Sequence, residues 1–66
     1  MEISVAQFER ELNALLDAAV SAASKETARR YLIQAENKIN GYDNIPEALQ
    51  REYRMLIERT KNQLGL

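Results

Sequence analysis

Apolar residues recur along the chain at the spacing of helical turns, in three consecutive stretches. The first stripe would share one helix face and consists of Val5, Phe8, Leu12, Leu15, Leu16, Ala19 and Ala23. The middle stripe consists of Ala28, Leu32, Ala35 and Ile39, flanked by Tyr31. The last stripe consists of Leu49, Tyr53, Leu56, Ile57, Thr60 and Leu64. This pattern predicts an all-α protein, with residues 1–66 forming a single helical domain.

The segment INGYDNIPEALQ marks the clearest boundary between two helices. Gly41 follows a helical pattern and can adopt the left-handed conformation that ends many helices. Pro46 has a fixed φ angle that suits the first turn of a new helix. We therefore expect one helix to end near Asn40 and another to start near Pro46. That last helix should run to about Gln63, with Gly65 ending it.

The start of the first helix is marked by the sequence SVAQ, a capping box in which Ser4 is the N-cap and Gln7 follows three residues later. Its end is ambiguous. At about 100° per residue, the first and middle stripes would point roughly 170° apart on one unbroken helix. The chain must either break between the two stripes or present two opposite apolar faces.

Two architectures resolve this mismatch. In the first, the chain breaks around residues 23–24, Ser24 caps a new helix, Glu26 lies in its first turn, and three helices form a small bundle. In the second, a long helix from Val5 to Asn40 forms a hairpin with the shorter last helix and dimerises. Its stripe for self-association would consist of Phe8, Leu12, Leu15 and Leu16. The phase of the stripes favours the break, whereas the lack of Gly, Pro, Asn or Asp at the turn favours the long helix. We expect the three-helix bundle and keep the dimerising hairpin as the alternative.

The composition excludes several kinds of chemistry. The chain has neither Cys nor His, so disulfides, thiolate metal sites and the usual Ser-His or Cys-His nucleophile pairs are ruled out. Its two glycines lie at helix ends and form no phosphate-binding loop. We therefore expect no enzyme activity, no cofactor and no metal site. A chain of 66 residues also has little core to spare for a substrate pocket.

The net charge of −1 gives no general attraction to nucleic acid or to an anionic membrane. The longest uncharged run, residues 18–24, is far too short to span a bilayer. The N-terminal MEISV lacks the basic and apolar regions of a signal peptide. We expect a complete, cytoplasmic chain without a membrane partner.

Charge is distributed unevenly along the chain. Residues 1–24 contain four acidic residues and one basic residue, a balance of −3. Residues 25–42 contain four basic and two acidic residues, a balance of +2. This contrast favours antiparallel packing of the two segments, within one chain or between two copies.

Several apolar and basic residues lie outside the stripes and are candidates for a contact surface with another protein. Tyr, Met and Arg are enriched in protein interfaces. The candidate partner-binding residues are Arg29, Arg30, Tyr31, Ile33, Tyr42 and Met55. We expect a small non-catalytic helical protein-binding module, a regulator or inhibitor of microbial or phage type that docks on a larger protein and is a homodimer.

The alternative function is a nucleic-acid-binding regulator with a basic patch on the second and third helices. The patch would consist of Lys25, Arg29, Arg30, Arg51 and Arg54. Glu47, Glu52 and Glu58 interleave with the basic residues of the last helix, and the domain has no basic excess. Nucleic acid is therefore the less favoured partner. A structural assembly subunit is a third hypothesis.

Overall fold

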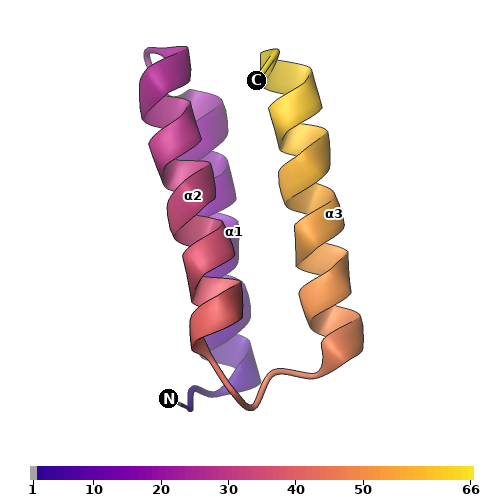
Figure 1. Ribbon diagram of the computed structural model, residues 1–66. Helices are drawn as coiled ribbons and strands as arrows, with labels where there is room; N and C mark the ends of the chain where they lie inside the picture. The colour runs from indigo at the N-terminus through magenta and orange to yellow at the C-terminus, as the bar shows by residue number, and fades with distance from the viewer. Residues whose placement is uncertain (1) are drawn as a thin grey trace.

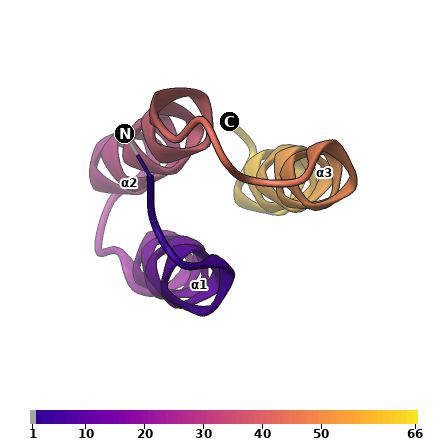
Figure 2. The ribbon, with the colours of Figure 1, turned by 90° about the horizontal axis from the view of Figure 1, so that it is seen from below.

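The computed structural model describes residues 2–66 as a bundle of three helices. These are α1 (Val5–Ser21), α2 (Lys25–Gly41) and α3 (Glu47–Leu64). Successive helices run in opposite directions, so α1 and α3 are parallel and the two chain ends lie at opposite ends of the bundle (Figure 1). Seen end-on, the helices occupy the corners of a triangle (Figure 2). The all-α three-helix bundle predicted from the sequence is confirmed.

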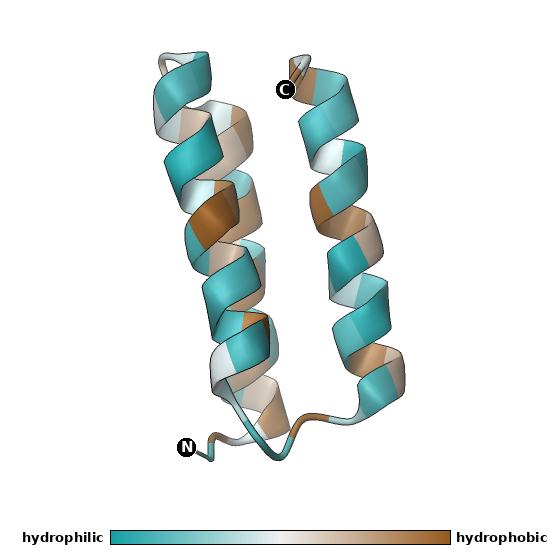
Figure 3. Ribbon diagram, in the orientation of Figure 1, coloured by the Kyte–Doolittle hydropathy of each residue, from teal (hydrophilic) through white to brown (hydrophobic). Residues whose placement is uncertain are grey.

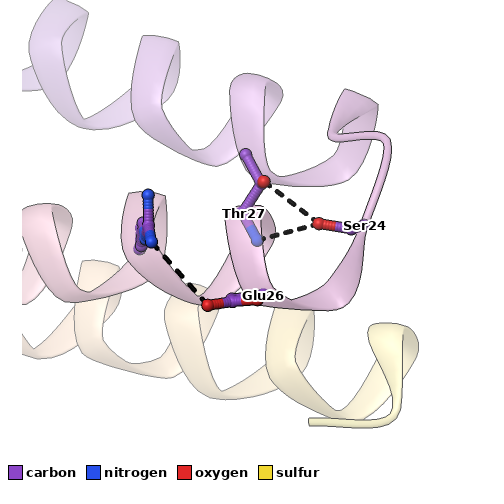
Figure 4. Close-up of polar contacts among 4 residues, drawn as sticks. Ser24, Glu26 and Thr27 are labelled. Atoms are coloured by element: carbon purple, nitrogen blue, oxygen red, sulfur yellow. Dashed lines mark hydrogen bonds and ion pairs between the residues drawn. The ribbon is translucent and has the colours of Figure 1, made fainter.

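The chain breaks between α1 and α2, as the phase of the stripes predicts. Ala22 and Ser24 both have extended backbone, with φ/ψ of −65°/145° and −139°/158°. The Ser24 Oγ accepts a hydrogen bond from the backbone N–H of Thr27 at 3.2 Å, which caps α2 (Figure 4). Any L-residue can adopt extended backbone, so this turn needs neither glycine nor a left-handed residue. The lack of Gly, Pro, Asn and Asp at this turn therefore does not prevent the chain from breaking between α1 and α2.

The C-terminal end of α2 differs from the prediction. The helix includes Gly41 and ends because Tyr42 has extended backbone, with φ −102° and ψ 134°. Among the glycines, only Gly65 has positive φ, at 73°. The prediction that Gly41 ends a helix in the left-handed conformation is wrong, whereas the same prediction for Gly65 is confirmed. Pro46 lies one residue before α3, and its carbonyl accepts the first hydrogen bonds of that helix.

The core is formed by the inward-facing stripe of every helix, and the alternation of hydrophobic and hydrophilic residues along each ribbon is visible in Figure 3. The buried apolar residues are Phe8, Leu12, Leu16, Ala19, Ala28, Leu32, Ala35, Ile39, Ile45, Tyr53 and Ile57. Three of these residues are alanines, Ala19 in α1 and Ala28 and Ala35 in α2, and such small side chains allow helices to approach closely. The bundle thus closes a core from a single chain.

This core corrects the self-association prediction. Phe8 and Leu12 are completely buried within the chain and Leu16 is 9% exposed. They cannot form a surface for a second copy while the bundle is folded, so the prediction is wrong for these three residues. The physical reason is the turn at Ser24, which lets the first stripe face the other two. Leu15 is half-buried at the edge of the core, and its role in self-association stays a prediction.

Candidate partner-binding surface

Tyr42 ties the C-terminal end of α2 to α1. Its hydroxyl donates a hydrogen bond to the Glu11 carboxylate at 3.0 Å, and its ring meets Phe8 edge-on with centroids 6.1 Å apart. The Lys38 ammonium donates to the same carboxylate at 3.0 Å. This contact joins the acidic first segment to the basic second segment within one chain. Tyr42 therefore has a role in the fold, and its predicted role in partner binding stays a prediction.

The Glu11–Lys38 contact predicts a pH dependence of stability. The hydrogen bond from Lys38 lowers the pKa of the Glu11 carboxyl below its usual 4.5. The unfolded chain therefore binds a proton at this site at higher pH than the folded chain. The stabilisation is fully present above pH 4.5 and is lost as pH falls through the folded-state pKa. Glu11→Gln should lower the free energy of unfolding at pH 7 by about 0.5 kcal/mol, and by less at acidic pH.

Urea denaturation at a series of pH values measures this effect. Lys38→Met is the matched variant, because it removes the same contact from the other side. The double variant should lose little more at pH 7 than either single variant, since both remove one interaction. Fully additive losses would show that the Glu11–Lys38 contact contributes nothing.

Arg29 and Ile33 are the predicted residues that the fold brings together. Both line an open depression of about 370 Å³ between α2 and α3, together with Glu36, Lys61 and Leu66. Ile33 is 48% exposed, although it lies next to the fully buried Leu32. Arg29 precedes Ile33 by four residues, so the two side chains stand one helical turn apart on the same side of α2.

The other predicted residues lie elsewhere on the bundle. Tyr31 and Ile33 flank the buried Leu32, so they point about 200° apart around α2. Arg30 is exposed and pairs with Glu26 at 3.7 Å. Met55 is 55% exposed and lies about 200° around α3 from the buried Ile57, which places it on the outer face. The six candidate residues therefore do not form one surface.

Three residues of the depression, Glu36, Lys61 and Leu66, were not among the sequence candidates. Lys61 donates to the Glu36 carboxylate at 2.8 Å, which joins α3 to α2, and this hydrogen bond raises the pKa of the Lys61 ammonium. Leu66 is folded back because the backbone after Gly65 turns, and its N–H donates to the Lys61 carbonyl at 2.8 Å. This glycine cap commonly brings the next residue into apolar contact with its helix. The sequence signal for Leu66 was thus the predicted end of the helix at Gly65.

The end of the bundle near the depression is rich in basic groups. Within residues 2–66, no carboxylate lies within ion-pair distance of Arg29 or Lys25. The Lys25 ammonium lies beside Gly65, 3.1 Å from where a Cβ on that glycine would be. Lys25 therefore adds its charge to the same end of the molecule as Leu66.

The basic patch predicted for nucleic-acid binding is divided between the two ends of the bundle. Lys25 and Arg29 belong to the first turns of α2, whereas Arg51 and Arg54 belong to the first half of α3, which runs in the opposite direction (Figure 1). Arg51 contacts Glu47 at 3.4 Å, and Arg54 donates to the Asn40 side chain at 2.7 Å. The five basic residues thus form no continuous face.

Residues 2–66 contain neither a metal-binding cluster nor a membrane-spanning helix. No group of three or more acidic, Cys or His side chains lies close enough together to bind a metal ion in this part of the chain. None of its helices has the length and apolar character needed to cross a bilayer. Comparisons with protein-family models, with curated proteins and with solved structures found no match.

Proposed function

We propose that this chain is a non-catalytic protein-binding module, a regulator or inhibitor that acts by docking on a larger protein. The observation that carries the proposal is the exposure of Ile33 beside Arg29 on a bundle whose core is already closed. An exposed β-branched apolar side chain loses contact with water when a partner covers it, and this gain favours association. Arginine next to it is typical of interface hot spots.

The bundle is suited to docking without rearrangement. Its helices are capped by Ser4, Ser24 and Gly65, and every helix pair is joined by a side-chain contact. A binding surface that is already ordered avoids the entropy cost of ordering it on association. Such a module acts on its target by covering a site or by stabilising one of the target's conformations.

The test uses the immobilised chain to capture proteins from a lysate of its source organism. One variant carries both Ile33→Asp and Met55→Asp, and the matched control carries both Val5→Asp and Val20→Asp, which also places two carboxylates at exposed apolar positions. We expect a protein that wild type and control retain and the double variant does not. Calorimetry with that purified protein should then show affinity at least about tenfold weaker for the double variant.

Two outcomes would contradict the proposal. The first is that no protein distinguishes wild type from the double variant while circular dichroism shows both to be folded. The second is micromolar binding to random duplex DNA that weakens steeply with salt, which would support the nucleic-acid alternative instead. Light scattering on the same samples tests the predicted homodimer.

A further inference from the structure

We propose that the depression between α2 and α3 docks an acidic amphipathic helix of the partner protein, with a large apolar side chain one turn from a carboxylate. This inference rests on the proposed function and specifies its site and ligand chemistry. Three features of the described residues carry it: the charge around the depression, the spacing of Arg29 and Ile33, and the extent of the groove.

The charge around the depression favours an acidic ligand. Arg29 and Lys61 are the basic residues that line the depression, Lys25 lies at the same end of the bundle, and Glu36 is the acidic lining residue. The Glu36 carboxylate already contacts the Lys61 ammonium at 2.8 Å. Within residues 2–66, Arg29 and Lys25 have no such contact. A carboxylate arriving from a partner would therefore find two free basic groups, with electrostatic attraction in its favour.

The spacing of Arg29 and Ile33 sets the pattern that the ligand needs. The two residues are separated by about 6 Å along the axis of α2. A partner helix that lies alongside α2 matches this spacing with an apolar residue and a carboxylate three or four positions apart. The apolar residue would contact Ile33 and Leu66, and the carboxylate would accept hydrogen bonds from the Arg29 guanidinium.

The groove extends far enough for a helix. A second depression between α2 and α3 is lined by Glu36, Arg54, Ile57, Glu58 and Lys61, and it shares Glu36 and Lys61 with the first. The α2 residues that line the two depressions run from Arg29 to Glu36 and span about 10 Å, which corresponds to two turns of a bound helix. Amphipathic helices commonly bind in grooves of this kind through side chains one turn apart.

The experiment selects peptides of about 12 residues, three helical turns, from a random display library on the whole chain. Binders to the Ile33→Asp variant are removed first. We expect the enriched sequences to be acidic, with Leu, Ile, Phe or Met three or four positions from Glu or Asp. One enriched peptide is then synthesised, and its affinity for the chain is measured by fluorescence anisotropy. This affinity should be about tenfold or more weaker for Ile33→Asp than for the wild type.

A charge exchange makes the test specific. Selection on Arg29→Glu should enrich Lys or Arg at the position that was acidic, because the variant replaces the positive charge at residue 29 with a negative charge. Arg10→Glu is the matched control: it changes the net charge equally at an exposed position of α1, and the selected peptides should remain acidic. Circular dichroism confirms that both variants are folded.

Three results would overturn the inference. The first is enrichment of neutral or basic peptides on wild type, and the second is enrichment that is the same on Arg29→Glu. The third is concentration-dependent assembly in light scattering that Ile33→Asp abolishes, which would assign the groove to a second copy of the chain. If the lysate experiment still yields a partner in these cases, the proposed function stands and only the ligand chemistry is wrong. If neither experiment yields a binder, both proposals fail.

Discussion

Phe8→Ala should lower the free energy of unfolding by about 3–5 kcal/mol, because it leaves a large cavity in the centre of the core. The Phe8 side chain is completely buried and meets the rings of Tyr42 and Tyr53 edge-on, at 6.1 and 5.7 Å. One side chain thus holds α1 against both other elements. A domain of this size has a total stability of about 3–10 kcal/mol, so much of the variant should be unfolded at room temperature.

Urea denaturation followed by far-ultraviolet circular dichroism measures this loss. The control is Val20→Ala on the same helix, where the side chain is 58% exposed and the change should stay within about 0.5 kcal/mol. Equal midpoints for Phe8→Ala and Val20→Ala would show that Phe8 is not at the centre of the core.

Arg30→Pro should lower the free energy of unfolding by about 3 kcal/mol, whereas Lys25→Pro should leave it nearly unchanged. Arg30 lies inside α2, where proline removes a backbone hydrogen bond and clashes with the preceding turn. Lys25 is the first residue of α2, and its N–H is not needed for the helix. The preceding Ser24 has extended backbone, which a residue before proline prefers.

Thermal melting distinguishes the two variants directly. For a domain of this length, a loss of 3 kcal/mol should lower the melting temperature by about 12 °C or more. Both substitutions remove one positive charge and introduce the same residue, so each is the control for the other. If Lys25→Pro destabilises as much as Arg30→Pro, α1 and α2 form one continuous helix in solution and the three-helix bundle is wrong.

The break at Ser24 was predictable because helical phase depends only on the order of the residues. The stripes of α1 and α2 could not share one core on a straight helix, and this constraint holds even though the turn lacks Gly, Pro, Asn and Asp. The conformations of the two glycines were predicted less well. Gly41 and Gly65 both follow helical patterns, yet only Gly65 has positive φ. Whether a helix ends in a left-handed glycine depends on where the next segment must go, and sequence near the glycine does not specify that.

The binding surface was predicted less well than the fold. Exposure of Ile33 and Met55 followed from their phase relative to the stripes, and it is observed. The grouping of Arg29 and Ile33 with Lys61 and Leu66 required the packing of α3 against α2. That packing joins residues about 30 positions apart in the sequence, and periodicity within one helix carries no information about it.

The odd number of helices has a mechanical consequence. Ile3 is held beside the α2–α3 loop by two hydrogen bonds to Asn44, at 3.1 and 2.7 Å, whereas Leu66 lies at the far end of the bundle (Figure 1). A load applied to the two ends of the chain would therefore pass along the full 32 Å length of the molecule. Two domains joined to those ends would therefore be held at opposite ends of the bundle, with the groove between α2 and α3 along its side.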